Sequence, residues 1–229
     1  MTCGLLVTFE GVDGCGKSTQ WQAVSEAIKV RYPEREIVQT RNPGGTVLGQ
    51  AIRRLLLTPL EASQAPMASM TELMLYMADR AQHIEEVVNP ALARGAIVLC
   101  DRFVDSSVAY QGAARGIEAE RVLQLNRLAC GDVHPHLTLL FDADVEILAQ
   151  RVAVRGNLDR LELEGLAFQE KVRQGFLRIA QAEPSRVKML DATLPIETLT
   201  AEAVALIESK EASTQAAESI WQTYFAEET

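Results

Sequence analysis

Short apolar runs alternate along the chain with longer stretches in which apolar residues recur every three or four positions. The short runs predict β-strands and the periodic stretches predict α-helices. Strands are expected near 5–10, 36–40, 96–101, 137–142 and 187–191. Helices are expected near 17–31, 46–57, 69–94, 118–130, 145–155, 165–182 and 196–209, with a further helix in the tail at about 211–229. This alternation predicts an α/β fold in which helices flank a five-stranded parallel sheet.

A parallel sheet binds its ligands at the carboxyl ends of its strands, so the residues just after each strand matter most. Those segments are 11–18, 41–46, 101–107 and 142–145. The length of 229 residues suits a single domain, 1–229. In the tail, apolar side chains typical of packing or of an interface cluster at Ile220, Trp221, Tyr224 and Phe225.

Composition narrows the range of partners. The net charge of −9 argues against broad binding to nucleic acid or to an acidic membrane, although local arginines can still hold a small anion. The four cysteines form no CxxC pair, which predicts a reducing compartment. No apolar run approaches membrane length and the N-terminus has no basic leader, so a soluble cytoplasmic protein is expected.

The first strand leads directly into the spacing Gly11-x-x-x-x-Gly16-Lys17-Ser18. This is the spacing of a phosphate-binding P-loop. Glycines let backbone N–H groups converge on one anion, and the helix that follows adds the positive end of its dipole. Lys17 is expected to neutralise the terminal phosphate of a nucleotide, and the Ser18 hydroxyl to bind Mg²⁺.

Two later strands end in charged residues suited to the same ligand. Arg41 follows the second strand at the start of a rigid turn, "RNPGGT", and its guanidinium can bind phosphate through a bidentate fork. Asp101 ends the third strand, as a carboxylate near the P-loop Mg²⁺ must. Arg102, beside it, is expected to reach a second phosphate.

The segment "RGNLDRLE" at 155–162 lies between two expected helices and is preceded by Arg151. Phosphoryl transfer needs cations over the transferred phosphate and the exclusion of water. A basic flap that closes on ATP would supply both, and Arg155 and Arg160 are suited to that role.

Tyr76 and Arg80 are four residues apart and share one helix face. An aromatic ring beside an arginine can stack on a nucleobase and hydrogen-bond its edge. From spacing alone, a structural ring beside a surface arginine is the simpler interpretation, and both remain open at this point.

Taken together, five segments in order resemble those of the bacterial thymidylate kinases, a family of P-loop nucleoside monophosphate kinases that phosphorylate dTMP with ATP. The resemblance extends from Phe9 to the "DAT" at 191–193. It rests on "FEGVDGCGKST", "RNPGGT" with "IRRLLL", "ELMLYMADRAQH", "DRFVDSSVAYQG" and "RGNLDRLE". It implies a three-layer P-loop kinase fold with a short LID at about 151–163, which we call the flap, and Mg²⁺ with ATP as the phosphoryl donor.

The resemblance also implies roles for individual residues. Asp13 would approach the deoxyribose 3′-OH, Tyr76 would stack on thymine and Arg80 would bond thymine O4. The implied dTMP-binding residues are Asp13, Arg41, Arg53, Tyr76, Arg80, Arg102, Ser107, Tyr110 and Gln111. The implied ATP-binding residues are Gly11, Val12, Asp13, Gly14, Cys15, Gly16, Lys17, Ser18, Thr19, Arg151 and Arg160.

Catalysis is then expected from Lys17, Arg155, Asp101 and Arg102, with Mg²⁺ on Ser18 and Asp101. Some members of the family carry an arginine directly after the P-loop aspartate. Gly14 holds that position here, so the transition-state arginine is expected to come from the flap, with Arg155 as first choice. The partners would be ATP, dTMP and, by family analogy, a second copy of the chain in a homodimer, with neither nucleic acid nor membrane.

Two departures from the family pattern affect the site. Asn42 replaces the glutamate usual in "REPGG", and Phe103 replaces the tyrosine usual in "DRY". Asn42 removes a carboxylate near several arginines, which leaves the local order there open.

Two other functions are open to a protein with a P-loop. A P-loop GTPase would need a guanine-reading N-K-x-D, which none of the four asparagines begins. The nearer alternative is another P-loop nucleotide or deoxynucleoside kinase. A deoxynucleoside kinase needs a base near a 5′-hydroxyl, whereas Arg41, Arg53 and Arg102 favour an acceptor that already carries phosphate.

Overall fold

Five parallel strands form one sheet with the order β2-β3-β1-β4-β5 in the computed structural model, which describes residues 3–59, 65–156 and 158–226. The strands are β1 (Leu5–Glu10), β2 (Ile37–Arg41), β3 (Ile97–Asp101), β4 (Leu137–Asp142) and β5 (Val187–Asp191). The predicted α/β class and all five predicted strands are confirmed, with boundaries that differ by one residue at most.

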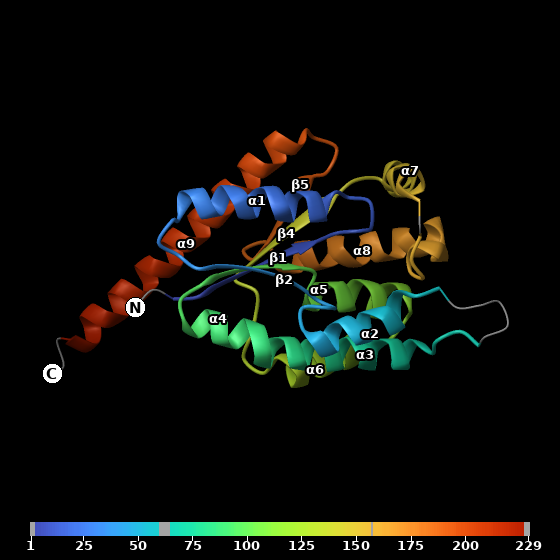
Figure 1. Cartoon of the computed structure of the whole chain (residues 1–229), viewed down its shortest axis with the longest axis horizontal. Helices are drawn as coiled ribbons and strands as arrows, with labels where there is room; N and C mark the ends of the chain where they lie inside the picture. Colours follow the sequence, from blue (N-terminus) through green and yellow to red (C-terminus); the bar gives the residue numbers. More distant parts are fainter. Residues whose placement is uncertain (1–2, 60–64, 157, 227–229) are drawn as a thin grey trace.

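The molecule has three layers (Figure 1). Helices α1 (Lys17–Arg31) and α9 (Ile196–Ala226) contact each other on one side of the sheet, and α8 (Leu166–Ala182) covers the other. The remaining elements are α2 (Val47–Leu57), α3 (Ser69–His83), η1 (Ile84–Val88), α4 (Asn89–Ala93), α5 (Val104–Ser107), η2 (Val108–Ala114), α6 (Ala119–Cys130), α7 (Val145–Arg155) and η3 (Glu162–Glu164). None of the described helices is long and apolar enough to span a membrane.

Alternation along β1 places its side chains in two apolar clusters. Leu5 and Phe9 pack with residues of α1 and α9, whereas Leu6 packs with residues of η1 and α4. Every residue of β1 is buried, as a central strand covered on both faces requires. This buried strand fixes the position of the loop that follows it.

The segment 104–114 is helical, which the sequence analysis did not predict. It forms α5 followed by η2, a π-helix, and its serines, glycine and valines have low helix propensity. Tertiary packing supports it instead, because η2 lies against α8, where Gly175 allows close approach. The helix therefore depends on a contact that local sequence does not reveal.

Two long helices also differ in detail from expectation. The helix expected at 69–94 is α3, the π-helical turn η1 and α4 in succession. The helix expected at 196–209 continues without a break into the tail as α9, which extends away from the body of the molecule (Figure 1). The side chains of Ile220, Trp221, Tyr224 and Phe225 lie outside the described part of the structure. The assignment of residues 151–163 to a flap and of residues 211–229 to a separate tail remains a prediction.

A matched pair of glycine substitutions tests the contact between α8 and η2. A Cβ at Gly175 would lie 2.9 Å from both Ala109 Cα and Ala113 Cβ, whereas one at Gly112 meets nothing closer than 3.8 Å. Gly175→Ala should lower the free energy of unfolding by about 1–3 kcal/mol through overpacking. Gly112→Ala should leave it unchanged or raise it by about 0.5–1 kcal/mol, since alanine favours helix. Urea unfolding measures both, and equal effects would refute the contact.

Candidate active site

The P-loop connects β1 to α1 at the carboxyl edge of the sheet. Gly16 precedes α1 with a φ of 82°, and Gly14 has a φ of 84°, values that L side chains rarely adopt. Because α1 begins at Lys17, the N–H groups of its first turn face the loop without intrahelical partners. The arrangement is that of an anion site.

Asp13 is the carboxylate inside this loop. It accepts hydrogen bonds from Arg102 Nη2 at 2.5 Å, from Tyr110 Oη at 3.0 Å and from Lys17 Nζ at 3.3 Å. Burial alone would raise the pKa of Asp13, but Arg102 and Lys17 hold it well below its usual range. Asp13 therefore remains an anion and ties the P-loop to the segment after β3.

Asp101 and Ser18 form a second junction beside the loop. Ser18 Oγ donates to Asp101 Oδ2 at 3.4 Å, while Asp101 Oδ1 is buried without a hydrogen-bond partner in the described structure. Within the described residues, groups of three or more His, Cys, Asp or Glu side chains suited to a metal are absent. One carboxylate and one hydroxyl suit Mg²⁺, which keeps several water or phosphate ligands.

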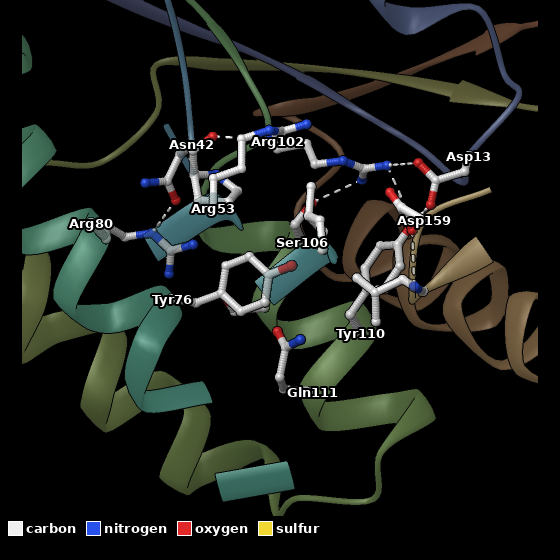
Figure 2. Close-up of a pocket in the computed structure, with 14 residues that line it drawn as sticks. Asp13, Asn42, Arg53, Tyr76, Arg80, Arg102, Ser106, Tyr110, Gln111 and Asp159 are labelled. Carbon is white, nitrogen blue, oxygen red and sulfur yellow. Dashed lines mark hydrogen bonds and ion pairs between the residues drawn. The ribbon is translucent and has the colours of Figure 1, made fainter. Parts of the chain in front are cut away.

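A pocket lies next to the P-loop (Figure 2). Its walls come from the P-loop, the turn after β2, helices α2 and α3, the segment 102–111 and the flap. It is lined by Asp13, Asn42, Pro43, Arg53, Leu57, Tyr76, Arg80, Arg102, Ser106, Ser107, Tyr110, Gln111, Asp159 and Leu161. Three guanidinium groups thus share one pocket with two carboxylates.

Arg80 is almost fully buried, with 1% of its surface exposed. All hydrogen-bond partners that the structure describes for its guanidinium are neutral groups. Its Nε donates to Asn42 Oδ1 at 3.0 Å, its Nη2 to Phe103 O at 3.1 Å and its Nη1 to Asn126 Oδ1. Asn42 is oriented by its other end, which donates to Asp79. Burial lowers the pKa of Arg80 while the nearby carboxylates Glu10 and Asp79 raise it, yet in the described contacts neither carboxylate bonds the guanidinium directly. The guanidinium is consequently prepared for an acceptor atom of a ligand in the pocket.

The thymidylate kinase family model matches residues 9–203. The thymidylate kinase of Pseudomonas putida is 48% identical over 204 residues, which cover 89% of this chain and 95% of that protein. That of Ectopseudomonas mendocina is 47% identical over 206 residues, covering 90% and 96% respectively. The chain belongs to the thymidylate kinase family.

A solved structure supports the same family assignment. The crystal structure of thymidylate kinase from Ehrlichia chaffeensis superposes with a TM-score of 0.72 at 32% identity, covering 90% of this chain and 99% of that one. The thymidylate kinase fold expected from the sequence is thereby confirmed.

The structure of this thymidylate kinase brings most of the predicted acceptor residues into the pocket. Eight line it: Asp13, Arg53, Tyr76, Arg80, Arg102, Ser107, Tyr110 and Gln111. Arg41 is at the end of β2 but outside this lining, with its guanidinium 5.7 Å from the centre of the Trp21 ring. Its predicted contact with phosphate stays untested.

The flap arginines have three different environments. Arg151 donates to Ala192 O at 2.9 Å. Arg155 pairs with Glu162, and 56% of its side chain is exposed. Arg160 donates to Leu56 O at 2.7 Å and to Glu72 at 2.6 Å, which places it beside the acceptor pocket rather than free over the P-loop. Arg155 is thus far more exposed than Arg160, of whose side chain 10% is exposed.

The structure accommodates the residues that differ from the family pattern, Asn42 and Phe103, and the glycine at position 14. Asn42 bridges Asp79 and Arg80 as a neutral link, so order is kept without a second carboxylate. Phe103 is fully buried, with its ring 5.5 Å from the guanidinium carbon of Arg80. A Cβ at Gly14 would lie 2.6 Å from Leu148 O, so this loop path has no room for an arginine there.

Sequence reasoning missed the buried polar residues that hold the site together. Glu10 accepts from Phe103 N at 2.7 Å and from Ser106 Oγ at 2.6 Å, and burial together with Asp105 raises its pKa to about 7. Glu72 and Asp79 are buried on α3 beside Tyr76 and Arg80. Their helical spacing from Tyr76, at i−4 and i+3, was the signal that they share its buried face.

The P-loop geometry can be tested with two alanine substitutions at glycines of nearly equal φ. Each should cost about 1–2 kcal/mol for the left-handed backbone. Gly14→Ala should cost about 1–3 kcal/mol more, because its Cβ overlaps Leu148 O. Gly16→Ala is the control, since nothing described lies within 4 Å of its Cβ. Urea unfolding without nucleotide measures the difference, and equal losses would contradict the described loop path.

Proposed function

We propose that this thymidylate kinase transfers the γ-phosphate of ATP to dTMP, giving dTDP and ADP for dTTP synthesis. The observation that carries the proposal is the convergence of Arg53, Arg80 and Arg102 on one pocket that adjoins the P-loop through Asp13. A nucleoside monophosphate supplies the negative charge that these arginines require. Lys17 lies at the boundary of the two sites, paired with Asp13.

The acceptor would lie along the pocket with its base beside Tyr76 and its phosphate near Arg53 and Arg102. Ser107 is one of the residues that line the pocket, and its Oγ is buried without a hydrogen-bond partner among the described residues, so a base edge could satisfy it. Tyr110 and Asp13 form the opposite wall, where the sugar would lie. Figure 2 shows Tyr76 on one side of the pocket and Tyr110 with Asp13 on the other.

The transfer needs positioning and charge neutralisation more than base catalysis. An oxygen of the dTMP phosphate attacks the γ-phosphorus of ATP, and the bond to the β–γ bridging oxygen breaks as ADP leaves. Mg²⁺, where bound, would be held by Asp101 and Ser18 and would neutralise phosphate charge. Arg102 aligns the attacking phosphate, Lys17 follows the γ-phosphoryl group, and the flap excludes water.

We also propose a cytoplasmic homodimer. Apolar side chains are exposed on the three helices α2, α3 and α6, with Leu55 at 61%, Met74 at 49% and Leu128 at 82%. Such side chains favour an interface over open solvent. Sedimentation equilibrium at micromolar concentration should give twice the chain mass of 25.1 kDa, and a monomer mass would overturn this part of the proposal.

The decisive experiment is ADP release measured across dTMP, dUMP, dCMP, dGMP, AMP and thymidine. We expect dTMP to have the highest kcat/KM and thymidine to be nearly inert, because thymidine leaves the arginines uncompensated. Lys17→Ala is the control, and its turnover should fall by about 10³-fold or more through loss of transition-state charge stabilisation. Turnover of thymidine above that of dTMP, or of GTP above ATP, would refute the assignment.

Arg155 is the expected source of transition-state charge. Arg155→Ala should lower kcat by about 10³-fold with little change in either KM, as for an arginine finger. Arg155→Lys should rescue poorly, because lysine lacks the planar fork. Steady-state kinetics with ATP and dTMP varied in turn distinguish a role of Arg155 in the transition state from one in substrate binding. Near-normal kcat with a greatly raised KM for ATP would show that Arg155 only binds the ground state.

A further inference from the structure

One buried carboxylate, Glu72 on α3, connects three parts of the molecule. None of its surface is exposed. It accepts from Gln111 Nε2 at 2.8 Å, from Arg160 Nη2 at 2.6 Å and from Arg115 Nη2 at 3.2 Å. These donors belong to the pocket wall on η2, to the flap and to the residue that follows η2. Despite burial, which raises it, the pKa of Glu72 is lowered by these partners, which favours the ionised form.

The contact with Arg160 places the flap against the acceptor side of the site. Arg160 Nε donates to Leu56 O at 2.7 Å, and its backbone N donates to Leu57 O at 3.0 Å. Leu57 and Leu161 both line the pocket. The base of the flap is thus attached where α2 ends, and Glu72 supplies the anion that holds it there.

The contact with Gln111 fixes the orientation of an amide in the pocket. An ionised carboxylate accepts hydrogen bonds only, so the NH₂ end of Gln111 must face Glu72. Its Oε1 is then the end that can accept from a ligand. A thymine base offers an N–H on its pairing edge, whereas cytosine has an acceptor nitrogen at that position.

We propose that Glu72 is a positioning residue for the reaction: one carboxylate holds the flap through Arg160 and orients Gln111 toward the acceptor base. The proposal rests on the proposed function and deepens it. It departs from the expectation that Arg160 binds ATP phosphate. Glu72 is not among the described residues that line the pocket, so its proposed effect on the acceptor passes through Arg160 and Gln111.

A double-substitution cycle tests the link to the flap. Glu72→Gln and Arg160→Ala should each raise KM for dTMP about 10- to 100-fold, the size of one lost charged hydrogen bond. KM for ATP should change less than threefold, and the double variant should be no worse than the poorer single variant. Glu164→Gln is the matched control, since it removes the other partner of Arg115 and spares Glu72.

The cycle separates the proposal from its rivals. An Arg160→Ala enzyme with a raised KM for ATP and an unchanged KM for dTMP would overturn it, because Arg160 would then serve ATP. Fully additive effects of Glu72→Gln and Arg160→Ala on the KM for dTMP would also overturn the proposal. Thermal unfolding followed by circular dichroism checks that each variant folds. If Glu72→Gln does not fold, the folded Arg160→Ala enzyme still decides between the two KM patterns.

Acceptor discrimination tests the link to Gln111. Glu72→Gln gives the neighbouring amide a partner that can donate as well as accept, so Gln111 can turn over. The ratio of kcat/KM for dTMP over dCMP should fall about 10-fold or more, and Glu72→Asp should restore part of it. A lower kcat with an unchanged ratio would overturn the positioning role. Inactivity of the wild-type enzyme on dTMP would instead refute the proposed function, independently of both tests.

Discussion

The ion pair between Asp13 and Arg102 is the contact on which the two halves of the site depend. β1 and β3 are paired with Phe9 opposite Asp101, so the P-loop and Arg102 leave the sheet side by side. Arg102 has a φ of 68°, which costs a non-glycine residue about 1–3 kcal/mol. Its guanidinium offsets that cost through Asp13, Gly11 O and Ser106 Oγ. A strained backbone is thereby retained beside the P-loop, where the proposed transfer would bring the two phosphates together.

Buried polar side chains keep this junction in place from behind. Glu10 binds the backbone N–H of Phe103 and the hydroxyl of Ser106, so the turn that carries Arg102 is fixed from β1. Asn42 and Asp79 do the same for Arg80 on the other wall. Each such group is costly to bury alone and rigid once satisfied. The pocket can therefore be preorganised before a nucleotide binds.

How far the sequence predicts this arrangement depends on whether a feature is local. Apolar runs gave all five strands, and glycine spacing gave the P-loop, because both follow from the residues within the segment. The helix at 104–114 was missed because its support comes from Gly175, far along the chain. The contact of Arg160 with α3 was not predicted, because charge and spacing do not say which side of a flap a side chain faces, and its expected role in binding ATP stays a prediction. Its partner, Glu72, is 88 residues away.

The charges lining the pocket bear on the choice between a phosphorylated and an unphosphorylated acceptor. Although the whole chain carries −9, the described pocket lining holds Arg53, Arg80 and Arg102 against Asp13 and Asp159. With Asp13 paired to Arg102, the lining keeps Arg53 and Arg80 against Asp159, and buried Asp79 behind the lining interacts with both arginines. Burial raises the pKa of Asp159, and nearby Asp13 raises it further. A nucleoside adds no negative charge to this arginine-lined pocket, whereas a nucleoside monophosphate brings its own counter-charge. Under the proposed function, the acceptor phosphate would thus supply the negative charge that balances these arginines.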